Sequence, residues 1–295
     1  MEDVKTKSLS ESIIIQHFLV AFLDVLGQRA ELRSLGSLPT NQEEIGKTGA
    51  ILKRTLGFVL QTRALFNEYF SEFNQPGEFL RSLPEPEQNL VRNLRQSEVS
   101  FYGFSDSFVV AIPLRTENDH CTQMNGIYAA FMASCCIPLC SLFSEHALRG
   151  GIDVGVGVQL ESGEVYGAAL ERAYSLESEV ADSPRIAIGN ELIRYLEFVR
   201  DQPATTVFAR CAKETARRNL RFITRDTDGQ PILDFLGEAF RRDSDRVVKP
   251  EFVGKAYNFV LKQCEEWTAT NNAKLGAKYE RLRTYFETRK RVWDL

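Results

Sequence analysis

Two aspartates interrupt stretches of sequence that are otherwise apolar enough to form buried strands. Asp24 lies within residues 22–27 (Phe-Leu-Asp-Val-Leu-Gly), and Asp106 lies within residues 101–108 (Phe-Tyr-Gly-Phe-Ser-Asp-Ser-Phe). A carboxylate is stable in a protein interior only when it is paired, hydrogen-bonded or bound to a metal ion. Two such acids at the ends of neighbouring strands therefore predict a site for divalent cations.

The composition predicts one large domain, or one domain with substantial extensions, in a cytoplasmic protein. Of the 295 residues, 43% are hydrophobic, and 36 basic against 40 acidic residues give a net charge of -4. This balance shows no basic excess that would indicate nucleic acid or a membrane surface as a partner. We expect no signal peptide and no membrane span, because no cleavage-site pattern and no stretch of about 18 uncharged apolar residues is recognised.

The cysteines are expected to be free thiols that pack as small apolar residues. None forms a C-x-x-C pair, and the three histidines have no spacing that suits a zinc site. The six are Cys121, Cys135, Cys136, Cys140, Cys211 and Cys264.

The first half of the chain alternates strand-like and helix-like patterns. Residues 13–25 are dense in Ile, Val, Leu and Phe and predict a buried strand, whereas 42–73 have the apolar spacing of a long amphipathic helix. Two short apolar runs within 99–114 predict a hairpin with Asp106 at its tip. The proline-rich and charged residues 74–97 predict an exposed, irregular insertion.

In the second half, residues 122–147 predict a core-facing helix and 150–160 alternate as a strand with one buried face. The remaining predictions are a helix over 167–179, a strand over 184–189, a helix from an Asn190 cap to about Arg200, a hairpin around Asp228 and two helices over 250–292. The order β-α-β-β-α-β predicts an α+β, ferredoxin-like core in residues 1–200. Residues 201–295 would form a C-terminal hairpin and helical extension packed on it.

Four short stretches carry residue types that bind phosphate or metal. Residues 24–28 form a turn whose exposed backbone N–H groups can hold phosphate oxygens. Residues 105–107 place Asp106 between two serines, and Arg149 comes directly before a strand, where its guanidinium can pair with phosphate. Residues 166–177 predict a turn of small residues that enters a helix.

These stretches resemble the class III nucleotidyl cyclases. The motifs of that family are roughly F-x-D-[IV]-x-G-F, a hairpin ending in G-D-S, a strand beginning R-x-G-I and a helix containing G-x-x-V-N-x-A-A-R-L-E. The matching residues are Asp24, Val25, Gly27, Asp106, Ser107, Arg149, Gly151, Ile152, Gly155, Gly167, Ala173, Leu176 and Glu177. The resemblance covers about residues 15–190 and implies a class III cyclase core.

Two positions depart from the pattern: Glu171 replaces the family's transition-state asparagine, and Ser175 replaces its transition-state arginine. The side chains that would recognise a purine are not recognisable either. The combination F-x-D-x-L-G, F-S-D-S, R-G-G-I and V-Y-G-x-A-L-x-x-A-Y-x-L-E, followed by S-P-R-I, is similar to the pyrimidine cyclases of the bacterial Pycsar antiphage system. This resemblance implies cyclisation of UTP, or alternatively CTP, to a 3′,5′-cyclic monophosphate and pyrophosphate, and the product would switch on a separate effector protein.

The resemblance also implies a two-metal mechanism. Asp24, Asp106 and the Val25 carbonyl would bind two Mg²⁺ or Mn²⁺ ions, one lowering the pKa of the ribose 3′-hydroxyl and one holding the triphosphate. Arg149 would bind the β- and γ-phosphates. The backbone amides expected to assist it are those of Val25, Leu26, Gly27 and Gln28.

The family's sites lie at a head-to-tail dimer interface, which implies a C2 homodimer with two equivalent sites. Candidates for contributions to the partner's site are Glu171, Arg172 and Tyr174. Candidates for recognising the base are Tyr69, Tyr102 and Asn67.

Two hypotheses of other classes stay open. Ferredoxin-like sheets also bind RNA, and the aromatic residues 102–104 loosely match the strand signature of such modules. However, Asp106 would place a negative charge beside the phosphates of the RNA. A catalytically inactive, cyclase-like regulatory dimer is permitted by Glu171 and Ser175, whereas the retained aspartate pair argues against it.

Overall fold

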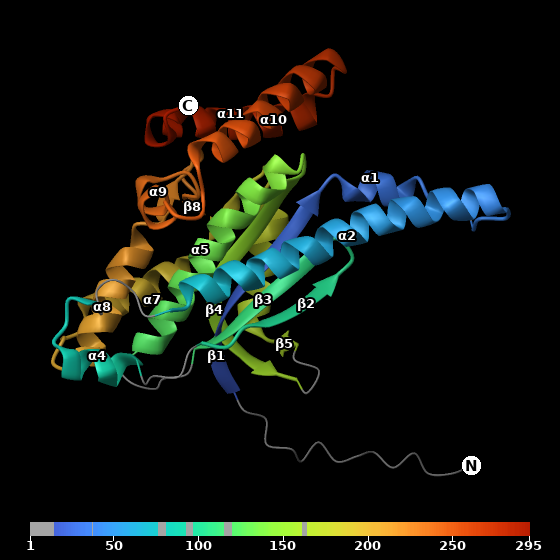
Figure 1. The fold of residues 1–295 in the computed structure, drawn as a ribbon. Helices are drawn as coiled ribbons and strands as arrows, with labels where there is room; N and C mark the ends of the chain where they lie inside the picture. The colour runs from blue at the N-terminus through green and yellow to red at the C-terminus, as the bar shows by residue number, and fades with distance from the viewer. Residues whose placement is uncertain (1–14, 37, 76–80, 93–96, 115–119, 161–163) are drawn as a thin grey trace, which may run out of the picture.

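The computed structural model shows an α+β protein built on one mixed sheet (Figure 1). It describes residues 15–36, 38–75, 81–92, 97–114, 120–160 and 164–295. The strands are β1 Ile15–Leu26, β2 Ser100–Phe104, β3 Ser107–Leu114, β4 Ala147–Gln159, β5 Val165–Tyr166, β6 Ile186–Ile188, β7 Ile223–Arg225 and β8 Pro231–Leu233. Their order in the sheet is β2-β3-β1-β4-β6-β8-β7, and β5 pairs with β4.

Helices cover both faces of this sheet (Figure 1). Before β4 they are α1 Gln28–Arg33, α2 Gln42–Phe73, α4 Glu85–Arg92 and α5 Cys121–Phe143. After β4 they are α6 Ala168–Ser175, a π-helix Leu176–Val180, α7 Asn190–Asp201, α8 Val207–Leu220, α9 Glu238–Asp243, α10 Pro250–Ala269 and α11 Ala273–Trp293.

The central strand β1 is apolar on both faces, as its sequence predicts. Successive side chains of a strand point to opposite faces. Leu19 and Leu23 therefore pack into the larger core beneath α2 and α5, whereas Phe18 and Val20 pack beneath α6. Because both faces are covered, the strand needs nearly continuous apolar sequence, and Asp24 near its end is an exception that requires a polar partner.

Antiparallel pairing with β3 on one side and β4 on the other holds β1 at the centre of the sheet. The predicted hairpin is confirmed, since β2 pairs with β3 and a two-residue turn, Ser105 and Asp106, joins them. The turn lies at the same end of the sheet as the last residues of β1, because Asp24 pairs with Ser107.

Helix α5 is long and apolar enough to cross a membrane, which corrects the expectation that no such stretch exists. In this fold, however, 89% of its most apolar stretch is buried inside the protein. Its apolar side chains form the centre of the main core against β1 and α2. The structure therefore uses α5 as a core helix.

Two glycines of β4 let α6 and the π-helix lie directly on the sheet. A Cβ at Gly151 would collide with the Ala173 carbonyl and with Leu176, and a Cβ at Gly155 would press on the backbone of Ala169. The glycines thus bring the π-helix, and with it Glu177, close to the start of β4.

Residues after 200 belong to the same sheet and core as residues before it. β6 is parallel to β4, and β8 pairs antiparallel with β6, so the predicted C-terminal hairpin extends the sheet. The buried side chains of α10 and α11, among them Val260 and Phe286, join the core formed by α5. The two predicted terminal helices are confirmed as α10 and α11.

Three local predictions are corrected. The insertion 74–97 is not irregular throughout, because Glu85–Arg92 form α4 and bury Val91. Asn190 is the first residue of α7 rather than its cap; the Asp153 carboxylate accepts the Leu192 N–H at 2.8 Å and caps the helix from the neighbouring strand β4. The basic residues of 207–220 lie on a helix, α8, that the sequence analysis did not predict.

Replacing Gly151 with Ala tests whether α6 needs this close approach. We expect the free energy of unfolding in urea to fall by about 1–3 kcal/mol, because the backbone around Ala173 must move. As a control, Gly46→Ala on α2 adds a methyl group with no atom within 4 Å and should raise stability by up to about 1 kcal/mol. Equal stability of the two variants would contradict the packing described.

Candidate functional site

Three polar side chains form a row across neighbouring strands at one end of the sheet. The register pairs Asp24 of β1 with Ser107 of β3 and with Arg149 of β4. All three side chains lie on the α6 face, because Asp24 alternates with Leu23 and Val25 of the opposite face. The Ser107 hydroxyl donates to Asp24 Oδ1 at 2.7 Å, and Arg149 Nε donates to Asp24 Oδ2 at 3.3 Å. Asp24 is only 4% exposed, so these two bonds compensate its burial.

Arg149 connects the row to the π-helix. Its Nη2 pairs with Glu177 Oε1 at 2.7 Å, and its Nη1 donates to the Ala181 carbonyl at 3.4 Å. Its side chain is 16% exposed, whereas that of Glu177 is 4% exposed. One guanidinium therefore neutralises two nearly buried carboxylates from different elements. Glu177, which matches the family motif, has no role in the sequence analysis beyond that match.

Asp106 lies beside this row, in the turn between β2 and β3. Its carbonyl accepts the Val25 N–H at 3.2 Å, which holds the turn against the end of β1. Ser105 has φ 56°, a left-handed conformation that reverses the chain within two residues. Asp106 is 5% exposed, and its buried Oδ2 has no hydrogen-bond partner among the residues described.

The turn after β1 leaves open space at Gly27, three residues after Asp24. Gly27 has φ +96°, and no atom lies within 4 Å of the position that a Cβ would take. The side chain of Gln28 is buried and donates to the Thr55 carbonyl of α2 at 3.3 Å, so it braces the turn rather than facing the opening. Val25 is buried as well, since its side chain packs in the main core.

The chemistry of these groups fits a hard divalent cation. Asp106 Oδ2 is a buried carboxylate oxygen that needs a positive partner, and Asp24 precedes Val25, whose N–H binds the Asp106 carbonyl. In the described part of the chain, no group of three or more His, Cys, Asp or Glu side chains is positioned to hold a metal ion. A cation here would therefore complete its shell with backbone, water or substrate oxygens, as Mg²⁺ commonly does.

Of the three residues considered for the base, only Tyr102 faces the side of the sheet that carries the acids. It packs with the residues beneath α6, and burial raises the pKa of its hydroxyl to about 12. Tyr69 lies on the opposite face, where its hydroxyl is 3.6 Å from Cys140 Sγ of α5 and burial raises its pKa. Asn67 is exposed on α2. The structure thus places Tyr69 away from the acids within one chain, and its role in recognising the base stays a prediction.

The candidates for the partner's site are placed differently from one another. Arg172 Nη1 donates to the Val154 carbonyl at 3.0 Å, so it fastens α6 to β4. Glu171 accepts a hydrogen bond from Ser175 at 3.0 Å on the exposed side of α6. Tyr174 is 52% exposed and packs edge-on against Phe22, with ring centres 5.3 Å apart. Tyr174 is thus the most available of the three for a partner.

Helix α11 also reaches Arg149, which the sequence analysis did not foresee. Arg149 and the α11 side chains Lys274, Lys278 and Arg281 line one pocket of about 430 Å³. Positions 274, 278 and 281 share one helical face, so their spacing was visible in the sequence. That Arg149 lies opposite them depends on the tertiary fold and could not be predicted from the spacing.

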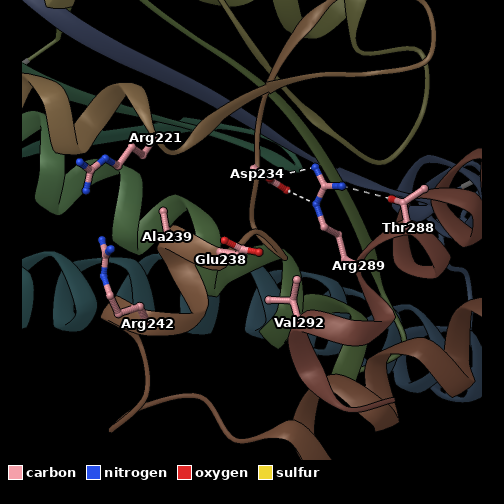
Figure 2. Close-up of a pocket in the computed structure, with 8 residues that line it drawn as sticks. All are labelled: Arg221, Asp234, Glu238, Ala239, Arg242, Thr288, Arg289 and Val292. Atoms are coloured by element: carbon pink, nitrogen blue, oxygen red, sulfur yellow. Dashed lines mark hydrogen bonds and ion pairs between the residues drawn. The ribbon is translucent and has the colours of Figure 1, made fainter.

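A second, separate pocket of about 590 Å³ lies between the C-terminal end of α8, the short helix α9 and the C-terminal end of α11 (Figure 2). Arg221 and Arg242 face each other across it, whereas Arg289 is tied to Asp234 of the β8 loop by two bonds of 3.1 and 3.0 Å. The Tyr285 hydroxyl donates to Asp234 at 2.7 Å. This cluster anchors α11 to the sheet and contains none of the residues of the row.

Comparisons of the sequence with family models and with curated proteins identify no relative. No protein-family model matches the chain, and a search of curated proteins finds no match. The case for a function therefore rests on the residues and their geometry.

Replacing Arg149 with Leu should destabilise the protein by about 3–5 kcal/mol, because Asp24 and Glu177 would remain buried without a counter-charge. Urea unfolding measures this loss. The double variant Arg149→Leu/Glu177→Leu should recover part of it. Arg194→Leu breaks an exposed pair with Glu191 and should cost at most about 1 kcal/mol. Similar losses for the two single variants would contradict the role assigned to Arg149.

Proposed function

We propose that the chain is a pyrimidine nucleotide cyclase that converts UTP to 3′,5′-cyclic UMP and pyrophosphate. The observation that carries the proposal is the placement of two nearly buried aspartates, Asp24 and Asp106, at one end of the sheet, with an Asp106 oxygen that lacks a partner among the described residues. A buried, unpartnered carboxylate oxygen is costly unless a cation binds it.

The order of the first four strands supports a ferredoxin-like core of the class III cyclase type. In a β-α-β-β-α-β unit of that kind, the first and third strands lie at the centre and each crossover passes a helix over one face. Here β1 lies between β3 and β4, β2 is at the edge, and α2 and α5 form the crossovers. The resemblance of the motifs at Asp24, Asp106 and Arg149 agrees with this arrangement.

Within the proposed reaction, the chain positions the triphosphate and the metal ions. When bound, two Mg²⁺ or Mn²⁺ ions would activate the 3′-hydroxyl and offset charge on the leaving pyrophosphate. Asp24 and Asp106 would hold them, with the Val25 carbonyl as a further oxygen. Asp24 would then exchange its 3.3 Å contact with Arg149 for the cation. The freed edge of Arg149 would turn to phosphate, which also accepts a guanidinium fork.

The proposed step forms the bond from O3′ to the α-phosphorus and breaks the bond between that phosphorus and the β-phosphate oxygen. The hydroxyl proton leaves to water, and pyrophosphate carries away the electron pair. The chain leaves open space at Gly27, and the backbone amides of Leu26, Gly27 and Gln28 would stabilise negative charge on the phosphates.

An exposed aromatic residue on the α6 side supports the proposed C2 homodimer. Tyr174 of α6 is 52% exposed and packs on Phe22 of β1, two residues before Asp24. A partner docked there would lie beside Asp24 and could supply the groups that Glu171 and Ser175 lack. We propose that the protein is cytoplasmic. Its cyclic product would bind and activate a separate effector protein.

Two outcomes of an assay separate this function from its alternatives. With Mn²⁺ and each of the four nucleoside triphosphates, we expect cyclic UMP from UTP; cyclic CMP from CTP would instead identify a cytidylate cyclase. Asp106→Asn should reduce turnover at least about 100-fold, because the metal loses a charged ligand. Product formation is measured by chromatography and mass spectrometry.

Asp245→Asn is the matched control, since Asp245 is an exposed acid just after α9 that pairs with Arg241 at 2.9 Å and takes no part in the site. It should keep full activity. Full activity of Asp106→Asn would remove the two-metal proposal. No product from any nucleotide would favour a regulatory dimer or an RNA-binding protein.

Replacing Tyr174 with Glu tests the homodimer. Sedimentation velocity should show a dimer for the original chain and a larger monomer fraction for the variant, because a charge would be buried in the apolar contact. Leu38→Glu, at a position 88% exposed and outside the α6 side, should leave the dimer intact. A chain that is active while wholly monomeric would contradict the arrangement.

A further inference from the structure

Helix α11 forms one wall of a cationic pocket next to Arg149. The pocket, of about 430 Å³, lies between the N-terminal half of α11 and the segment that follows α6. The lining residues used below are Arg149, Asp182, Ser183, Lys274, Lys278 and Arg281. In Figure 1, the hairpin of α10 and α11 lies over the end of the sheet where β1 finishes and β4 starts.

The positive charges in this pocket exceed the negative ones. Arg281 pairs with Asp182 at 2.7 Å, and Arg149 pairs with Asp24 and Glu177. Lys274 and Lys278 form no salt bridge with any residue that the structure describes. Two ammonium groups one helical turn apart thus line the pocket without a salt bridge, and Asp182, an acid in the same lining, is already paired with Arg281.

Lys278 is in an environment that disfavours its charge. Its pKa is lowered, first by partial burial and then by the neighbouring guanidinium of Arg149. A polyanion between Lys278 and Arg149 would relieve this repulsion and compensate the lost hydration. The buried hydroxyl of Ser183 adds a neutral donor at the same wall.

The pocket adjoins the candidate metal site through a single side chain. Arg149 contacts Asp24 through Nε and the Ala181 carbonyl through Nη1, and it lines the pocket as well. A ligand with charges spread along a chain can therefore extend from Asp24 past Arg149 to α11. Phosphate groups linked in a row have this shape and charge, and both Arg and Lys bind them.

We propose that α11 binds the outer phosphates of the nucleoside triphosphate through Lys278 and Lys274, an assignment that rests on the function proposed above. The role of the C-terminal segment is then to complete the substrate site from the same chain. The Asp234–Arg289 bonds at the other end of α11 fix its direction (Figure 2). Trp293, fully buried, donates to the Leu236 carbonyl at 2.9 Å and fixes its end.

Isothermal titration without metal tests the pocket independently of turnover. The probes are tripolyphosphate, UTP and inorganic phosphate, each titrated into the full-length protein and into Lys278→Met, which keeps the apolar stem but removes the charge. We expect tripolyphosphate and UTP to bind the variant roughly tenfold more weakly, the effect of one charged hydrogen bond. Inorganic phosphate should bind both proteins weakly.

Lys262→Met is the matched control, because Lys262 is a lysine of α10 that is 64% exposed and outside the pocket. It should bind all probes as the original chain does. Equal affinity of Lys278→Met and Lys262→Met for tripolyphosphate would overturn the proposal, and so would inorganic phosphate binding as tightly as tripolyphosphate. Binding that depends on Lys278 in a protein that cyclises no nucleotide would support the polyphosphate site and overturn the cyclase.

Discussion

The structure depends on one arginine that compensates two acids in a place where water hardly reaches. Asp24 and Glu177 come from β1 and the π-helix, and Arg149 of β4 lies between them with contacts of 3.3 and 2.7 Å. Removing these three charges from water is costly, so the ion pairs add little net stability. Their main effect is to fix β1, β4 and the π-helix in one arrangement. The glycines of β4 make that arrangement possible, because they let the π-helix approach closely enough for Glu177 to reach the guanidinium.

The position of Arg149 also places acidic and basic side chains on its two sides. Arg149 contacts the Asp24 carboxylate of β1 on one side and lines a pocket with Lys274 and Lys278 of α11 on the other. Asp106, held by the Val25 amide, adds a carboxylate oxygen that no described residue satisfies. The carboxylates thus lie on one side of Arg149 and the lysines on the other. This suits a ligand whose phosphate chain binds metal ions at one end and is negatively charged at the other.

Much of the fold followed from the sequence because its signals are local. The apolar run of β1, the turn at Asp106 and the periodicity of α5 each specify an element without help from the rest of the chain. The helix Glu85–Arg92 was missed because charged residues and prolines hide the single buried side chain, Val91. The start of α7 differs from the prediction because its cap comes from the Asp153 carboxylate, which accepts the N–H of Leu192, 39 residues later in the chain.

The candidate site was predictable only in part, for the same reason. That Asp24 and Asp106 lie at the same end of the sheet follows from two strand ends and one hairpin. The helical pattern of α2 could not indicate that Tyr69 faces α5, since periodicity defines a buried stripe but not what covers it. The lysines of α11 form a visible stripe, yet nothing local relates them to Arg149, more than a hundred residues earlier in the chain.

The pairing of β8 with β6 has a consequence for how this chain can vary. The edge of β6 that does not pair with β4 pairs with β8, which begins at Pro231. The last strands of the sheet thus come from the last third of the polypeptide. A shorter relative ending after α7 would leave open backbone groups that attract strands of other molecules. The C-terminal segment is therefore joined by backbone pairing, through β8 and β6, to β4, the strand that carries Arg149.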